Sequence, residues 1–144
     1  MDQTRLYFVV HDFGDDSDVV TRLLGITPTR VWRRGQPRPG RSGPPAKYEL
    51  WALDSTLPEA APFDEHLAAI VSQLERAAAG MREVLARFSA HLQCHSQFST
   101  YNPGFEIPAA LVQRVAALGL GIDFDLYVLY EDEPAGPAPD PLSA

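Results

Sequence analysis

The order of strand-like and helix-like segments is the feature that most constrains how this chain folds. Runs rich in β-branched and aromatic residues, typical of strands, cover residues 5–11, 47–55, 89–98 and 122–131. Apolar residues recur at helical spacing just before Gly25, over residues 63–78 and over residues 107–119. We expect Gly80 to interrupt the long middle helix, with residues 81–88 continuing as a further helical piece. The predicted order is β-α-loop-β-α-β-α-β.

This order predicts an α+β fold with a single sheet of about four strands and helices packed on one face. The first and last helical segments both end in Leu-Gly, at Leu24-Gly25 and Leu118-Gly119, and each is followed by a strand or an extended segment. We therefore expect a ferredoxin-like arrangement built from two βαβ-like halves. Residues 1–131 are expected to form one domain, and the acidic, Pro-rich residues 132–144 a disordered tail.

Composition excludes several classes of protein. A chain of 144 residues can bury a core without disulfides or metals. Its single cysteine, Cys94, excludes an internal disulfide and fits a reducing compartment, so we expect a cytoplasmic location. No run approaches the ~18 apolar residues that span a membrane, and the N-terminal residues lack the features of a secretory signal. We expect no membrane association.

A basic segment stands out in a chain whose net charge is -7. Residues 30–47 contain no acid, and Pro and Gly dominate residues 34–45, which predicts a loop. Guanidinium groups bind oxyanions bidentately and stack on indole rings, so this segment could hold an anion around Trp32. The alternative is that its arginines pair with the protein's own acids, at residues 12–18 or at Asp123 and Asp125, while Trp32 fills the edge of the core. The basic residues of the segment are Arg30, Arg33, Arg34, Arg38, Arg41 and Lys47.

The histidines of residues 89–98 raise the question of a metal site. In a strand, His91 and His95 share one face but lie about 13 Å apart, too far to bind one zinc ion; in a helix they would meet at i, i+4. The composition favours the strand, and we expect no metal. Cys94 faces the other way with Leu92 and Phe98, which predicts a packed thiol rather than a nucleophile.

Carboxylates occur on the last predicted strand. Alternation places Asp123, Asp125 and Tyr127 on one face, with the two carboxylates some 7 Å apart. Such a pair could serve acid–base chemistry, and the alternative is that both acids simply solvate an open sheet face. No phosphate-binding glycine loop and no Gly-x-Ser-x-Gly motif is present. We therefore expect no cofactor and lean towards a protein that is not an enzyme.

Several segments together resemble a bacterial family known as domain of unknown function 4279. They are "LLGITPTRVWRRGQ", the Trp-containing segment "YELWALDS", the long amphipathic helix after it, and "LGLGIDFDLYVLYE". The resemblance implies a bacterial, single-domain α+β protein and assigns no catalytic residue.

Two functions remain open at this point. The first is a non-enzymatic recognition protein, of an immunity or accessory type, that docks a protein partner through the basic Trp/Arg loop. The alternative is a site for a small molecule or anion on the open sheet face, catalytic or not. A homodimer formed through that face is a third possibility, and we do not expect a nucleic-acid partner because the basic stretch is short. The candidate binding residues are Arg30, Trp32, Arg33, Arg34, Trp51, His91, His95, Asp123, Asp125 and Tyr127.

Overall fold

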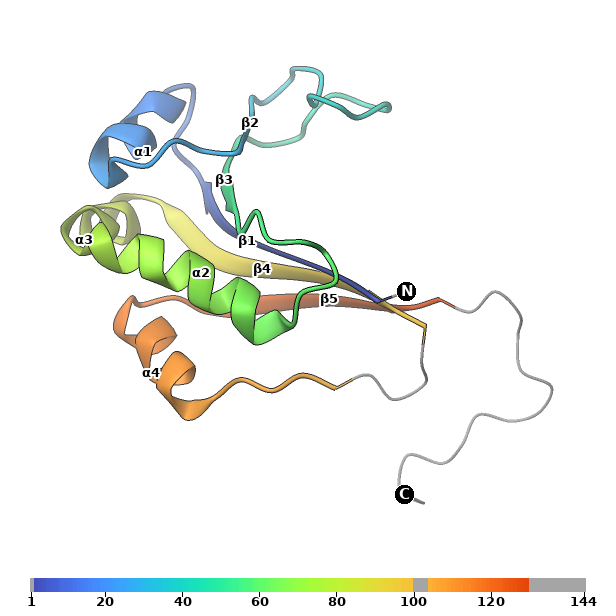
Figure 1. Cartoon of the computed structure of the whole chain (residues 1–144). Coiled ribbons are helices and arrows are strands. Elements are labelled where there is room, and N and C mark those ends of the chain that lie inside the picture. The colour runs from blue at the N-terminus through green and yellow to red at the C-terminus, as the bar shows by residue number, and fades with distance from the viewer. Residues whose placement is uncertain (1, 100–103, 130–144) are drawn as a thin grey trace.

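The first strand of the chain lies in the middle of the sheet. This structure, a computed structural model, describes residues 2–99 and 104–129. Strand β1 (Gln3–His11) pairs antiparallel with β3 (Leu50–Asp54) on one side and with β4 (Ser89–Phe98) on the other. Strand β2 (Arg30–Trp32) pairs antiparallel with β3, and β5 (Ile122–Val128) pairs parallel with β4. The sheet therefore has five strands in the order β2-β3-β1-β4-β5 (Figure 1).

The four helices of the described residues lie on one face of this sheet (Figure 1). They are α1 (Ser17–Leu24), α2 (Phe63–Arg76), α3 (Ala78–Arg87) and α4 (Ala109–Ala117). Helix α4 connects the parallel neighbours β4 and β5. Strands β1 and β2 run in the same direction, with β3 between them. The mixed α+β fold with one open sheet is as predicted, with one strand more than the four expected.

Alternation along β1 separates the covered face from the open face. Leu6, Phe8 and Val10 are at most 1% exposed and pack under the helices. Burying each of these side chains stabilises the fold by about 1.5–3 kcal/mol. On the other face, Tyr7 and Val9 belong to a small apolar cluster with Leu50, Ala52 and Trp32. The open face is otherwise polar, and it is there that candidate site residues gather.

The element bounds confirm some predictions and correct others. Strand β4 has the predicted bounds, whereas β3 is shorter than the predicted residues 47–55. Strand β2 was not predicted, because three residues are too few to show alternation. The long helix ends at Arg76, and the helical geometry is broken at Ala77, with φ -108° and ψ 28°. The prediction that Gly80 interrupts it is wrong, since Gly80 lies inside α3.

Gly80 is instead the point where α3 touches α1. A Cβ atom at this position would lie 1.9 Å from the backbone oxygen of Leu23. Only glycine allows the two helices to approach this closely. Helix α1 ends at Leu24. The next residue, Gly25, takes a left-handed conformation with φ 64° and its N–H donates to the Thr21 oxygen, as its position in the sequence predicted.

The proposed single domain of residues 1–131 and the expected disorder of residues 132–144 remain predictions, and the tail lies outside the described residues. In the described part of the chain, every helix is too short or too polar to cross a membrane.

Candidate functional site

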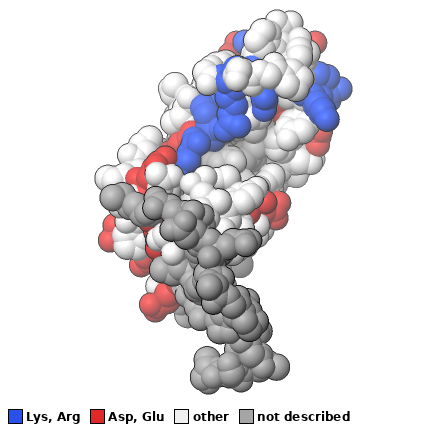
Figure 2. Space-filling view, turned by 90° about the vertical axis from the view of Figure 1, so that its right-hand side faces the viewer, with Lys and Arg blue, Asp and Glu red and all other residues white. Residues whose placement is uncertain are grey.

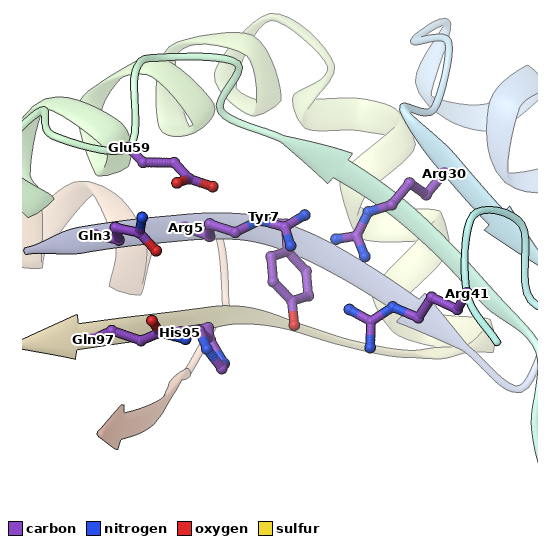
Figure 3. Close-up of a pocket in the computed structure, with 8 residues that line it drawn as sticks. All are labelled: Gln3, Arg5, Tyr7, Arg30, Arg41, Glu59, His95 and Gln97. Atoms are coloured by element: carbon purple, nitrogen blue, oxygen red, sulfur yellow. The ribbon is translucent and has the colours of Figure 1, made fainter. Parts of the chain in front are cut away.

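A cavity of about 290 Å³ lies on the open face of the sheet, beside the loop between β2 and β3 (Figure 3). Its walls come from β1, β2, β4, the β2–β3 loop and the connection between β3 and α2. The volume is at the lower end for sites that bind small molecules. The cavity is lined by Gln3, Arg5, Tyr7, Arg30, Arg41, Glu59, His95 and Gln97.

Arg30 is held in place by Asp54. Its Nε donates to Asp54 Oδ2 at 2.9 Å and its Nη2 donates to Oδ1 at 3.1 Å. The Thr29 hydroxyl also donates to Asp54 Oδ2, at 2.6 Å, and accepts a hydrogen bond from the Asp54 N–H at 2.8 Å. Two parallel hydrogen bonds from one guanidinium fix its plane as well as its position. Arg30 is therefore oriented before any ligand arrives.

Tyr7 lies beneath this guanidinium. The Arg30 Cζ atom is 4.5 Å from the centre of the Tyr7 ring, within the range of a cation–π interaction. Burial raises the pKa of the Tyr7 phenol, and the nearby Arg30 and Arg5 only partly oppose this rise. The phenol therefore stays protonated at neutral pH and can donate a hydrogen bond to an anion in the cavity.

Two further arginines reach the cavity. Arg5 projects from β1, with its Nη2 3.7 Å from Asp54 Oδ1. Arg41 comes from the loop, and its Cζ lies 5.7 Å from the centre of the Trp32 ring. Figure 3 shows the guanidinium groups of Arg30 and Arg41 both pointing towards Tyr7. Across residues 2–99 and 104–129, no carboxylate lies within 4 Å of Arg41.

The cavity is electropositive in a protein of net charge -7. Three arginines line it against one acid, Glu59. Figure 2 shows Lys and Arg gathered in the upper part of its view, with acidic residues around them. A hollow lined by one sign of charge concentrates ions of the opposite sign. The chemistry of this site favours an anion.

Arg34, a predicted binding residue, is engaged elsewhere. Its Nη2 lies 3.2 Å from Glu49 Oε2, and the Glu49 side chain is 5% exposed. Burial by itself would raise the pKa of Glu49, but backbone N–H groups, including that of Gly14, together with Arg34 outweigh it and lower this pKa. The alternative, that arginines of this basic segment pair with internal acids, describes Arg30 on β2 and Arg34 in the loop. Their partners are Asp54 and Glu49, not the acids suggested by the sequence.

Two backbone hydrogen bonds join the beginning and the end of the loop between β2 and β3. The Gly35 N–H donates to the Ala46 oxygen at 2.8 Å, and the Ala46 N–H donates to the Gln36 oxygen at 3.0 Å. Gly35 has φ 76°, which favours glycine at this turn. Arg33 is exposed at the start of the loop and does not line the cavity.

The predicted residues of β4 and β5 lie on the open face, as alternation indicated. Asp123, Asp125 and Tyr127 pair in register with Gln93, His95 and Gln97. The His91 Nε2 is 3.6 Å from Asp123 Oδ2, Gln93 donates to Asp125 at 3.1 Å, and the rings of His95 and Tyr127 are 5.0 Å apart. Of these residues, only His95 and Gln97 line the cavity.

No metal cluster forms from them. Within the part of the chain that the structure describes, no three His, Cys, Asp or Glu side chains come together as metal ligands. Asp123 and Asp125 stand on the open face next to β4 rather than around a cavity.

Trp51, one of the candidate binding residues, lies on the helix-covered face. It is fully buried, and its indole N–H donates to the Thr21 hydroxyl at 3.0 Å. It therefore cannot contact a ligand on the open face. Cys94 is also fully buried on the helix-covered face, and burial raises the pKa of its thiol, as a packed cysteine requires.

A family model described as a domain of unknown function (DUF4279) matches residues 2–129. The chain belongs to this family. The match to DUF4279 runs from the residue before β1 to the residue after β5, so it includes every element of the sheet and every residue lining the cavity. It confirms the family that the sequence segments resembled. Comparisons with curated proteins and with solved structures gave no match.

Six residues that line the DUF4279 cavity were absent from the predicted set: Gln3, Arg5, Tyr7, Arg41, Glu59 and Gln97. Alternation in "QTRLYFVVH" could have revealed three of them, because it places Gln3, Arg5 and Tyr7 on one strand face. The composition of residues 5–11 indicated a buried strand. Glu59 follows Pro58 in a connection, where the sequence carries no periodic signal.

Proposed function

We propose that this protein is a non-enzymatic binding protein that holds an anionic ligand in the cavity on the open face of its sheet. The observation that carries the proposal is the convergence of Arg5, Arg30 and Arg41 on a single hollow. Arg30 is already oriented by Asp54, so little side-chain entropy is lost when a ligand binds it. Tyr7 and His95 add hydrogen-bonding groups to the same cavity.

The proposal is tested by calorimetric titration of inorganic phosphate and pyrophosphate at low ionic strength. Arg41→Ala removes a cavity arginine, and Arg33→Ala removes the same charge from the same loop but outside the cavity. Affinity should fall about tenfold in Arg41→Ala, equivalent to about 1.4 kcal/mol, and remain within about twofold of wild type in Arg33→Ala. Equal losses in the two variants would point to general charge attraction, and the absence of binding to wild type would overturn the proposal.

Recognition of an acidic protein partner is the second candidate. It is supported by Arg33 and Lys47, which are exposed and, among the described residues, have no carboxylate within 4 Å. Reversing Arg34 is a poor test because it would break the pair with buried Glu49. Arg33→Glu with Lys47→Glu should abolish capture of a specific partner, whereas Arg41→Ala should not.

Three finer predictions also remain proposals. One is an immunity- or accessory-type role in a bacterial cytoplasm, and the second is a homodimer formed through the open face. The third is a ferredoxin-like relationship for β1 to β4, supported by the order β2-β3-β1-β4 and by the antiparallel pairing of each neighbouring pair.

A further inference from the structure

We propose that the ligand is bipolar, with an oxyanion at the Arg30–Arg41 end of the cavity and an ammonium group at Glu59. This inference rests on the proposed function, since it names the chemical class of the anion that the cavity would hold.

The two ends of the cavity lie at different positions along β1. The Arg30 guanidinium lies over the Tyr7 ring. At the other end, the Thr4 N–H donates to the backbone oxygen of Glu59 at 2.8 Å, which fixes the Glu59 backbone beside Thr4. Thr4 and Tyr7 are three residues apart on one strand, a distance of about 10 Å. Figure 3 shows Glu59 at the end near Gln3, away from Arg41.

The Glu59 end presents groups that suit a cation. Within residues 2–99 and 104–129, no Lys, Arg or His nitrogen lies within 4 Å of the Glu59 carboxylate. Gln3 and Gln97, which are directly opposite one another on β1 and β4, flank the same end. Their side-chain carbonyl oxygens can accept hydrogen bonds beside the carboxylate. Together these groups can accept hydrogen bonds from the three N–H donors of an ammonium group.

The formal charge of the site indicates which net charge on the ligand would complement it. Arg5, Arg30 and Arg41 are opposed by Glu59 and by Asp54, which contacts two of the arginines, so the formal charge of the site is +1. A phosphate monoester carries about -1.5 to -2 at neutral pH. Adding one ammonium group brings the ligand close to -1, which complements the site. An alkyl phosphate without the amine would leave the Glu59 carboxylate without a partner.

The test compares butyl phosphate with 4-aminobutyl phosphate, two probes that share the anionic head and differ in the terminal amine. Both are titrated into the whole protein by calorimetry at low ionic strength. Wild type should bind the amine-bearing probe about three- to fivefold more tightly, as expected for an exposed charge pair. Glu59→Gln should abolish this preference without weakening the binding of butyl phosphate. Glu83→Gln removes the same charge from an exposed position on α3, outside the cavity, and should keep the preference.

The two ways to fail are distinguishable. If wild type binds both probes equally, or if Glu59→Gln keeps the preference, the bipolar ligand is ruled out while the anion site stands. If neither probe binds, the anion site falls and the bipolar ligand with it.

Discussion

Asp54 binds Arg30 through both of its carboxylate oxygens, at 2.9 Å and 3.1 Å, at the point where β2 joins the sheet. Strand β2 has only three residues, and its own ladder to β3 is correspondingly short. The ion pair and the hydrogen bonds of Thr29 to Asp54 reinforce that ladder from the side. The same contacts that attach β2 therefore also orient an arginine of the cavity.

Replacing Asp54 should show this contribution directly. Asp54→Asn keeps the size of the side chain but removes its charge and an acceptor. We expect a loss of about 1–2 kcal/mol in the free energy of unfolding, since hydrogen bonds to charged groups are stronger than neutral ones. Urea denaturation measures it. Asp16→Asn is the control, because Asp16 pairs with Arg22 where both side chains are more than half exposed, and it should change stability by less than about 0.5 kcal/mol.

Gly80→Ala should destabilise the protein even though alanine is the better helix former. The added Cβ would meet the Leu23 oxygen at 1.9 Å, so α1 and α3 must separate. We expect a loss of about 1–3 kcal/mol, the usual range for overpacking, which outweighs the gain of about 1 kcal/mol in helix propensity. Thermal melting compared with Gly121→Ala provides the check, because nothing lies within 4 Å of a Cβ at Gly121. A more stable Gly80→Ala variant would contradict the close approach of the two helices.

The histidines of β4 and the Asp54–Arg30 pair show which features a sequence can predict and which it cannot. Alternation placed His91 and His95 on one face of β4 correctly, because the side-chain period of a strand is local. It could not say that Asp54 would meet Arg30, because ion-pair partners depend on the order of strands in the sheet.

The interpretations of Trp51 and Gly80 were wrong, each for a different physical reason. Trp51 was a candidate binding residue, but alternation along a strand does not tell which face the helices cover, and they cover the face that carries Trp51. Gly80 was interpreted as a helix breaker by its propensity, whereas tertiary contact with α1 explains it. Residues in local patterns were thus predictable, and residues defined by contacts between distant segments were not.

The buried histidine His66 predicts a pH dependence of stability. Its side chain is 1% exposed, its Nδ1 shares a hydrogen bond with the Ser55 hydroxyl, and burial lowers its pKa below the ordinary value of 6.5. The unfolded chain therefore takes up a proton near pH 6.5 while the folded chain does not, so stability falls as pH decreases from about 6.5 towards the lower folded pKa.

Melting temperatures measured at pH 7.5 and at more acidic values test this prediction. His66→Asn keeps a hydrogen-bonding group near Ser55 but cannot titrate, so the part of the pH dependence that comes from His66 should disappear. His91→Asn, on the open face, should retain it. An unchanged slope in His66→Asn would show that other groups cause the acid sensitivity.

The two tryptophans should respond differently to a soluble quencher. Trp51 is fully buried, whereas Trp32 is partly exposed on the open face beside Arg38 and Arg41. Acrylamide should quench the fluorescence of a Trp51→Phe variant strongly and that of a Trp32→Phe variant weakly. Trp51→Phe should also lose stability, because it deletes the hydrogen bond to Thr21 and leaves unfilled space in the core. Equal quenching of the two variants would mean that Trp32 is covered.

The central position of β1 has a consequence for how the chain folds during its synthesis on the ribosome. This strand is synthesised before the two strands that flank it, which lie far along the chain: Gln3 is opposite Gln97 and Val9 is opposite Ala52. Until β4 has left the exit tunnel, the edge of β1 that pairs with β4 stays unpaired. Contacts between such distant segments form slowly, so nascent chains stopped before Phe98 should depend on chaperones in a way that the finished protein does not.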